Sequence, residues 1–130
     1  MKLENIKLQG EIFPPASVEN ILKAEHALGI DLPVEYSDFL KVANGAYFEN
    51  GIRIYPLDEL VERNETLEVT EYAPGFLAIG DDNSEYVFIV DQTLKPSPIF
   101  MVFVGSMDPD DKVRVGDSLE SWLQSGCPRQ

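Results

Sequence analysis

The stretch "FLAIGDDNSEYVFIVD", Phe76 to Asp91, decides the fold. Two apolar runs flank the polar segment Asp81-Asp82-Asn83-Ser84-Glu85. The run from Tyr86 to Val90 is entirely apolar or aromatic, which is typical of a strand covered on both faces, so we predict a central position in a sheet. Gly80 frees the backbone, and Asp, Asn and Ser side chains bond to nearby amides in turns. The stretch therefore predicts a hairpin of strands 76–79 and 86–90 with exposed acids at its tip.

The acidic turn does not have the pattern of a metal or catalytic site. An EF-hand loop that began at Asp81 would need Gly at position six and Glu at position twelve, but the sequence has Tyr86 and Gln92 there. A catalytic carboxylate pair must aim at one reacting atom, whereas the adjacent Asp81 and Asp82 would point to opposite faces of an extended chain. We therefore expect no metal and no cofactor.

Two helices are predicted before the hairpin. Ser17 can cap the first, in which Val18, Ile21, Leu22 and Leu28 recur near helical spacing before Gly29 stops it. Pro33 is expected at the first position of the second helix, with an apolar face spaced i, i+3, i+4, i+7 and Asn44-Gly45 at its end. That face consists of Tyr36, Phe39, Leu40 and Ala43.

Shorter elements fill the rest of the chain. Ile52 to Tyr55 alternates like a half-buried strand, and Pro56 opens a short helix. Asn64 to Gly75 has no clean period. Ile99 to Val104 predicts a strand, and a short one is expected around Val113 and Val115.

Asp117 and Glu120 have the spacing of a capping box, which predicts a last helix with Leu119, Trp122 and Leu123 on one face. Helices first, consecutive strands next and a helix last suggest an α+β fold with a largely antiparallel central sheet, as a single domain over residues 1–130.

The strongest global feature is charge. Ten Lys and Arg against 23 Asp and Glu give a net charge of −13. So acidic a chain repels nucleic acid and anionic membranes and attracts a basic partner, although acidity alone also serves solubility. The opening "MKLENIKLQG" lacks the apolar core of a signal peptide, and there is one cysteine, so we expect a cytoplasmic protein without disulfides.

The sequence offers little for catalysis. His26 is the only histidine and Cys127 the only cysteine, and they lie far apart. His26 is expected at the surface, and Cys127 lies near a C-terminus that we expect to be frayed. No Gly-x-Ser-x-Gly motif or phosphate-binding glycine loop is present. We therefore predict that the protein is not an enzyme.

Several segments, in order, resemble the SUKH superfamily, the Smi/Knr-like domains. The segment "ILKAEHALGIDLPVEYSDFLKVANGAYF" resembles its opening, matched by Leu28-Gly29, Leu32-Pro33 and Asn44-Gly45. The later "IYPLDELVE", "FLAIGDDNSEYVFIVD" and "SLESWLQSG" resemble its short helix, its hairpin and its closing helix. Family members often carry several glycines after the Gly-Asp of the hairpin, where this chain has residues 82–85, "DNSE".

The resemblance implies helices packed on a sheet and no shared catalytic residues. Many bacterial members are immunity proteins that neutralise a polymorphic toxin, often a nuclease, and others are eukaryotic regulatory or scaffold proteins. We therefore expect a protein that occludes a basic toxin domain. The expected partner-binding residues are acids at the hairpin tip, a second acidic strip and two aromatic anchors. They are Asp81, Asp82, Glu85, Asp58, Glu59, Glu62, Tyr47 and Phe48.

Two other functions remain open at this stage. One is a regulatory scaffold domain that binds an endogenous protein. The other is a metal-dependent hydrolase that uses carboxylates alone, which binding of divalent cations would reveal. The aromatic residues Tyr47 and Phe48 could equally belong to the core, and the sequence does not separate these positions.

Overall fold

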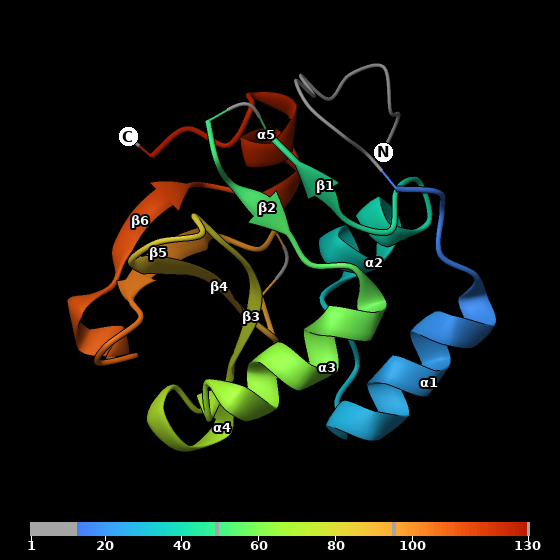
Figure 1. Cartoon of the computed structure of the whole chain (residues 1–130), viewed down its shortest axis with the longest axis horizontal. Helices are drawn as coiled ribbons and strands as arrows, with labels where there is room; N and C mark the ends of the chain where they lie inside the picture. Colours follow the sequence, from blue (N-terminus) through green and yellow to red (C-terminus); the bar gives the residue numbers. More distant parts are fainter. Residues whose placement is uncertain (1–12, 49, 95, 130) are drawn as a thin grey trace.

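The computed structural model describes residues 13–48, 50–94 and 96–129. Five α-helices, one 3-10 helix and six strands follow one another along these residues (Figure 1). The helices are α1 (Val18–Leu28), α2 (Val34–Leu40), α3 (Leu57–Thr66), α4 (Val69–Tyr72), α5 (Leu119–Gln124) and the 3-10 helix η2 (Pro109–Asp111). The strands are β1 (Ala46–Tyr47), β2 (Arg53–Ile54), β3 (Phe76–Asp81), β4 (Tyr86–Asp91), β5 (Ile99–Phe103) and β6 (Val113–Gly116).

The strands form one sheet in chain order, β1-β2-β3-β4-β5-β6, and every neighbouring pair is antiparallel. This arrangement confirms the predicted α+β class and the antiparallel sheet. Because consecutive strands pair directly, no crossover connection is needed inside the sheet. The two long strands β3 and β4 lie in the middle, and the short strands β1 and β6 form its edges.

The central position of β4 is confirmed, since Val87, Phe88, Ile89 and Val90 are all buried. The register between β3 and β4 shifts between Ala78 and Gly80. At Gly80 the backbone of β2 comes very close: a Cβ there would lie 2.3 Å from the carbonyl oxygen of Arg53. Only glycine allows this approach, so Gly80 joins the first hairpin strand to β2.

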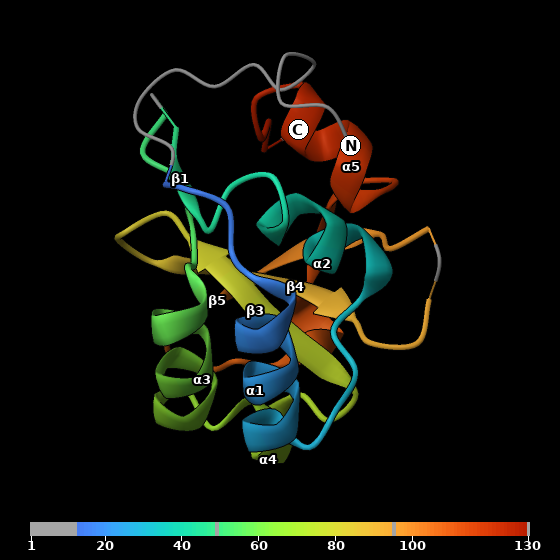
Figure 2. The same cartoon turned by 90° about the vertical axis from the view of Figure 1, so that its right-hand side faces the viewer.

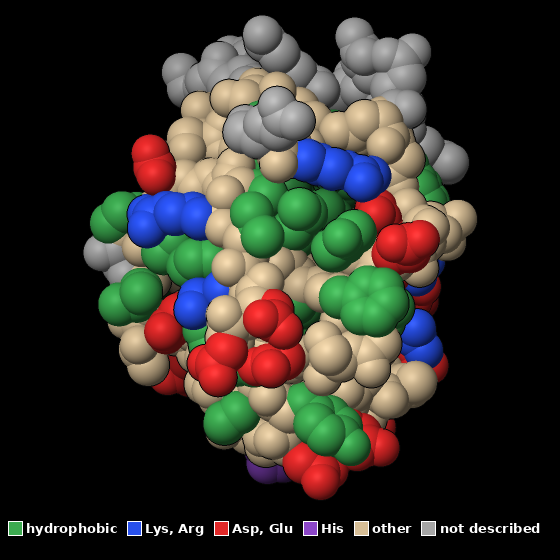
Figure 3. Space-filling view, turned by 90° about the vertical axis from the view of Figure 1, so that its left-hand side faces the viewer, with side chains coloured by type: hydrophobic (Ala, Val, Ile, Leu, Met, Phe, Trp, Pro, Cys, Tyr) green, Lys and Arg blue, Asp and Glu red, His purple; other side chains and the backbone are tan. Residues whose placement is uncertain are grey.

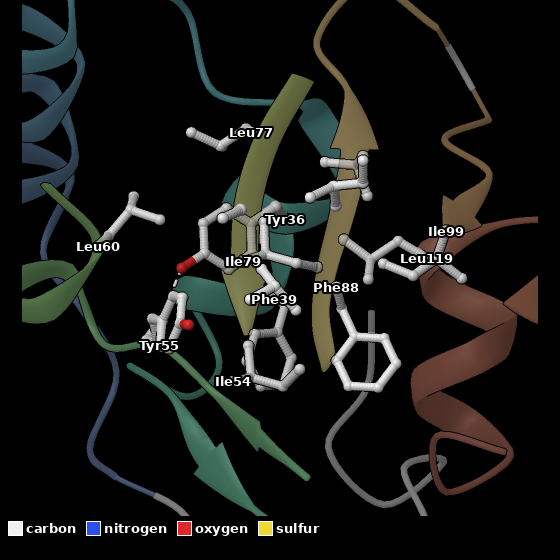
Figure 4. Close-up of a cluster of buried hydrophobic side chains, with 14 of the residues drawn as sticks. Tyr36, Phe39, Ile54, Tyr55, Leu60, Leu77, Ile79, Phe88, Ile99 and Leu119 are labelled. Atoms are coloured by element: carbon white, nitrogen blue, oxygen red, sulfur yellow. Dashed lines mark hydrogen bonds between the residues drawn. The ribbon is translucent and has the colours of Figure 1, made fainter. Parts of the chain in front are cut away.

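Helices α1, α2 and α3 lie together on one side of the molecule, with the sheet beside them (Figures 1 and 2). The core between them draws buried residues from every α-helix and every strand of the described chain, and Figure 4 shows a part of it around β3 and β4. The hydroxyl of the fully buried Tyr36 donates a hydrogen bond of 2.7 Å to the carbonyl oxygen of Tyr55, so even this polar atom is satisfied. Trp122 is buried against Phe88, as its predicted core position requires.

The first helix begins and ends as predicted but buries a different face. The Ser17 side chain accepts a hydrogen bond from the Asn20 amide, and Gly29 ends the helix with a left-handed φ of 71°. Ile21 is buried, but Val18 and Leu22 are 60% and 58% exposed. The reason is packing: α1 is an outer helix in contact with α3, and only a narrow face of it is covered.

Other expectations on local structure need correction. Pro33 precedes α2 instead of occupying the first helical position, whereas Pro56 opens the following helix as predicted. The helix after Pro56 continues to Thr66, and α4 follows inside the segment that had no clean period. The last helix is capped by Ser118, whose hydroxyl accepts from the Ser121 amide.

The C-terminal end of the described chain is packed. Asp117, the predicted cap of the last helix, instead pairs with Arg114 on the surface. Cys127 is fully buried, so the expectation of a frayed end is wrong at this residue. The Asn50 amide holds this segment by donating to the carbonyl oxygens of Gly126 and Cys127.

Candidate protein-interaction surface

The first acid of the hairpin, Asp81, belongs to a polar cluster with Arg53 and Tyr55. The Arg53 guanidinium donates to both carboxylate oxygens, at 2.8 and 3.1 Å, and the Tyr55 hydroxyl donates at 2.7 Å. The Asn83 amide adds a bond of 2.9 Å. Only 14% of the Asp81 side chain is exposed, so the expectation of an exposed acid is wrong here. Its carboxylate fixes the hairpin to β2.

These contacts set the protonation of the cluster. Burial by itself would raise the pKa of Asp81, but the hydrogen bonds from Arg53, Tyr55 and the Asn83 amide hold that pKa below its ordinary value. Burial and the bond to Asp81 raise the pKa of Tyr55. The Asp81 carboxylate also raises the pKa of Arg53. The cluster therefore stays ionised as Asp81 carboxylate and Arg53 guanidinium at neutral pH.

The second acid of the hairpin is also internal. Only 4% of the Asp82 side chain is exposed, because the adjacent turn and the C-terminal segment surround it. One of its oxygens accepts from the amides of Ser84 and Tyr86, and the other pairs with Arg129 at 3.1 Å. Asp82 therefore shapes the turn and anchors the end of the chain, and its predicted exposure is wrong.

The exposed part of the hairpin tip consists of Asn83, Ser84 and Glu85. Asn83 has a left-handed φ of 60°, a conformation that Asn tolerates better than most residues. Of the three predicted acids at this tip, only Glu85 has a carboxylate free to meet a partner. The predicted turn is confirmed. Two of its acids, Asp81 and Asp82, are hydrogen-bonded within the fold, and the third, Glu85, is exposed.

The second acidic strip lies on α3. Asp58, Glu62 and Glu65 are exposed and spaced i, i+4, i+7, which places them on one face of the helix; we call them the acidic stripe. Glu59 is turned toward the hairpin and pairs with Arg53 at 3.3 Å. Arg63 pairs with the neighbouring Glu62 through two bonds, at 2.7 and 3.0 Å. Within the described residues, the stripe therefore leaves the charges of Asp58 and Glu65 without a partner at the surface, whereas the charge of Glu62 is compensated by Arg63.

The two predicted aromatic anchors differ in position. Tyr47 is 41% exposed and its ring meets Phe13 edge-on, at 5.9 Å between centroids. Phe48 is 5% exposed and belongs to the core, so it does not face a partner in this structure. Successive residues of an extended chain point to opposite sides, which explains why only one of the pair is at the surface.

A hollow lies between the hairpin tip and α3. Its volume is about 240 Å³, and its polar lining includes Arg53, Tyr55, Arg63 and Asp81, together with the turn residues Asn83 and Ser84. Apolar walls are supplied by Leu67, Val87 and Val104. Sequence reasoning did not find this hollow, because its lining comes from β2, α3 and the hairpin, and no single segment carries the pattern.

Exposed apolar side chains adjoin the hollow at the end of β5. Phe103 is 48% exposed and packs edge-on against Tyr86, and Val104 is 37% exposed. The face of the molecule on the β5 and β6 side has apolar side chains in its middle, with basic and acidic ones around them (Figure 3). The sequence did not predict the exposure of Phe103 and Val104. The run from Ile99 to Val104 is apolar throughout, so it does not distinguish its buried residues from its exposed ones.

Three further acids, Asp108, Asp110 and Asp111, lie at the 3-10 helix η2. Asp108 precedes η2 and accepts a hydrogen bond from the Asp110 amide.

His26 is exposed on α1, as predicted. Across residues 13–48, 50–94 and 96–129, no three His, Cys, Asp or Glu side chains gather closely enough to hold a metal ion. In the same ranges, no helix combines the length and apolar character needed to span a bilayer.

The fold defines a class of α+β proteins in which helices pack beside a six-stranded antiparallel sheet. Comparison with known sequences gives the family: the SMI1 / KNR4 family (SUKH-1) matches over residues 15–125, and the chain belongs to it. A relative is YnaB of Bacillus subtilis (strain 168), described as an uncharacterized protein. The two are 28% identical over 111 residues, which cover 84% of this chain and 74% of YnaB.

Proposed function

We propose that this protein is a non-enzymatic immunity protein that binds a cognate polymorphic toxin, a nuclease, and occludes its active or substrate-binding surface. The proposal rests on membership of the SUKH-1 family, in which binding proteins of this kind occur. It places the protein in the cytoplasm as one domain, with a basic toxin domain as partner and without direct contact to nucleic acid or membrane.

The observation that carries the proposal is the acidic stripe on α3. Two of its carboxylates, those of Asp58 and Glu65, project from one helical face without a partner among the described residues. Glu62 is paired with Arg63, and Glu85 adds a further carboxylate at the neighbouring hairpin tip. A nuclease needs cationic side chains to hold phosphates, so a surface of fixed carboxylates is complementary to its substrate-binding groove. With a net charge of −13, the whole chain adds long-range attraction and raises the association rate at low salt.

The apolar side chains beside the hairpin are expected to supply most of the binding affinity. Rim charges mainly steer encounter, whereas affinity comes from a few well-packed anchors, often aromatic. Phe103 is exposed beside the hollow and packs edge-on against the half-buried Tyr86, and Tyr47 is a further exposed aromatic residue. We therefore assign the anchoring role to Phe103 and Tyr47 and remove Phe48 and Asp82 from the contact surface.

A survival assay tests the proposal. The toxin-like domain encoded next to this gene is expressed in a susceptible host with and without this protein, and colonies are counted. Rescue is expected, together with a stable complex in size-exclusion chromatography. A catalytically inactive toxin variant controls for expression load. If a demonstrably toxic neighbour kills equally in both cultures, that pairing is rejected and the scaffold function becomes the better explanation.

A further inference from the structure

The loop between β1 and β2 contains a chemically reactive dipeptide, Asn50-Gly51. Asn44 and Asn50 are the asparagines of the chain that precede a glycine. In such a pair the backbone nitrogen of the glycine can attack the side-chain carbonyl carbon of the asparagine, because glycine has no side chain to hinder ring closure. The chain therefore has two candidate sites for this reaction, and the fold decides between them.

The fold exposes one of these pairs and encloses the other. Asn50 and Gly51 are both exposed, and among the described residues a Cβ at Gly51 would have only the Asp82 carbonyl oxygen nearby, at 4.0 Å. Gly45 is buried, and a Cβ there would lie 2.8 Å from the nitrogen of Pro56. The backbone at Gly51 thus has room to turn and access to water, whereas the backbone at Gly45 has neither.

The Asn50 side chain folds back over its own loop. Its Oδ1 accepts a hydrogen bond of 3.3 Å from the Ile52 amide, which makes an Asx-turn around the Gly51 peptide. The nucleophile of the reaction, the Gly51 nitrogen, donates to the Phe48 carbonyl oxygen at 3.1 Å. These bonds slow the reaction relative to an unfolded chain, but they belong to an exposed loop, and such loops open locally at low cost.

The same side chain holds residues 126–129, which we call the C-terminal strap. Nδ2 of Asn50 donates to the carbonyl oxygens of Gly126 and Cys127, at 3.2 and 3.1 Å. Cys127 is fully buried and has a left-handed φ of 59°, a conformation that is unfavourable for most residues other than glycine. Contacts from outside the strap must therefore keep it in place, and Asn50 supplies two of them.

We propose that Asn50 is a site of spontaneous deamidation and that its conversion releases the C-terminal strap. A bond forms between the Gly51 nitrogen and Cγ of Asn50, the Cγ–Nδ2 bond breaks, and ammonia leaves with the proton of the Gly51 amide. Water then adds to one carbonyl carbon of the cyclic imide and opens the ring. The product is aspartate or isoaspartate, and no oxidant or reductant takes part.

The product cannot make the contacts that hold the strap. A carboxylate has no hydrogen to donate, and at residue 50 it would face the carbonyl oxygens of Gly126 and Cys127. Acceptors then lie against acceptors, and the two carbonyl groups lose their donor. Isoaspartate also lengthens the backbone of the loop. With either product, the attachment of the strap to the loop is lost.

The strap is also connected to the hairpin tip. Arg129 of the strap pairs with Asp82 at 3.1 Å, and Asp82 accepts hydrogen bonds from the amides of Ser84 and Tyr86 in the hairpin turn. A strap that has left its place no longer holds Arg129 beside that carboxylate. Deamidation of Asn50 is thus a slow, one-way chemical change that loosens the strap and removes the support of the turn.

The experiment incubates the isolated full-length protein in mildly alkaline buffer and samples it over time. Chymotryptic cleavage after Tyr47 or Phe48 places Asn44 and Asn50 in different peptides, and mass spectrometry follows each, since deamidation adds about 1 Da. In the folded protein the Asn50 peptide should convert at least about tenfold faster, because the buried pair must first open. In concentrated urea the two should convert at similar rates.

Release of the strap is measured in the same samples by the reaction of Cys127 with a thiol-specific aromatic disulfide. Labelling of the converted protein should be about tenfold faster, the effect of about 1.4 kcal/mol in lost hydrogen bonding. Asn50→Asp imitates one product and should label at this higher rate from the start. Asn50→Gln is the matched control: its longer side chain must close a larger, less favoured ring, so its labelling rate should stay constant during incubation.

Equal conversion of Asn44 and Asn50 in the folded protein would overturn the proposed site, as would an Asn50 that stays intact while the urea samples convert. If Asn50 converts and Cys127 labelling does not change, the release of the strap is refuted. These measurements need no partner protein. Their failure therefore leaves the proposed function standing, and failure of the survival assay leaves the deamidation site standing.

Discussion

The side-chain amide of Asn64 completes the backbone hydrogen bonding of Ala78 on the neighbouring strand. Asn64 donates from Nδ2 to the Ala78 carbonyl oxygen and accepts at Oδ1 from the Ala78 amide, both at 2.9 Å. Strand β2 pairs with β3 only beside Gly80 and Asp81, and Tyr55 then adds one bond to Ile79. Asn64 thus takes the place of a strand residue where β2 has ended.

Asn64→Asp tests this relationship, because it preserves shape and removes the donor. The carboxylate would face the carbonyl oxygens of Leu60 and Ala78, which the amide now satisfies. A loss of about 2–4 kcal/mol in the free energy of unfolding is expected from buried groups left unpaired. Urea denaturation followed by circular dichroism measures it. Asn20→Asp on the exposed face of α1 is the control; a similar small loss at both positions would contradict this role.

Gly80→Ala should be among the most destabilising alanine substitutions in the chain. Its Cβ would meet the Arg53 carbonyl oxygen at 2.3 Å, and backbone atoms cannot move aside as a flexible side chain can. We expect a loss of at least about 3 kcal/mol, in the range of severe overpacking. Gly29→Ala, where no atom lies within 4 Å and only the left-handed φ opposes alanine, should cost about 1 kcal/mol. Equal thermal midpoints for the two variants would refute this explanation.

The pairing of Asp81 with Arg53 predicts a pH-dependent contribution to stability. The pKa of Asp81 is lower in the folded than in the unfolded chain, where it is about 3.9. Its stabilisation is therefore complete above that value and is lost as pH falls through the lower, folded pKa. Asp81→Asn should cost about 1–3 kcal/mol at pH 7 and progressively less as the pH falls through the lowered pKa of Asp81 in the folded chain.

Denaturant titrations at a series of pH values between 2 and 7 provide this measurement. Asp117→Asn serves as the control, since 95% of that side chain is exposed in its pair with Arg114. Its effect should be negligible at every pH. A cost of Asp81→Asn that does not change with pH would show that the lost carboxylate charge is not the cause.

Cys127 should be unreactive until the C-terminal segment opens. Burial raises the pKa of its thiol, and the reactive thiolate is scarce in the folded state. Labelling by a thiol-specific aromatic disulfide should be at least about a hundredfold slower in buffer than in 8 M urea. Asn50→Ala removes two bonds to this segment and should speed labelling in buffer. Rapid labelling of the unchanged protein would contradict the observed burial.

If the protein binds a toxin as proposed, neutralising exposed acids should slow capture of that toxin. Asp58→Asn, Glu65→Gln and Glu85→Gln together remove three charges from side chains without structural hydrogen bonds in the described chain. The association rate should fall several-fold at low salt, and its salt dependence should flatten, because steering depends on these charges. Stopped-flow mixing measures both quantities.

The control variant removes the same number of charges elsewhere: Asp110→Asn, Asp111→Asn and Asp117→Asn, which are exposed near η2 and β6. It should keep most of the association rate. If the two variants slow association equally, net charge alone guides the encounter, and the stripe has no special role.

The sequence alone was sufficient for the elements whose signals are local. The unbroken apolar run from Tyr86 to Val90 predicted a central strand, and Ser17 and Gly29 predicted the ends of α1. Periodicity and capping act over a few residues, so they can be read without the fold. The same is true of the net charge, which predicts the sign of a partner but not the place of contact.

Only the tertiary structure decided which polar residues remain free. Asp81, Asp82 and Glu85 look alike in sequence, yet Arg53 and Arg129 bind the first two, and those arginines are 28 and 47 residues away. The hollow likewise joins β2, α3 and the hairpin. Hydrogen bonding of a side chain depends on what the fold brings within about 3 Å, and no local pattern encodes it. The sequence therefore determined the secondary-structure elements and the net charge, and tertiary packing determined which polar side chains remain exposed at the surface.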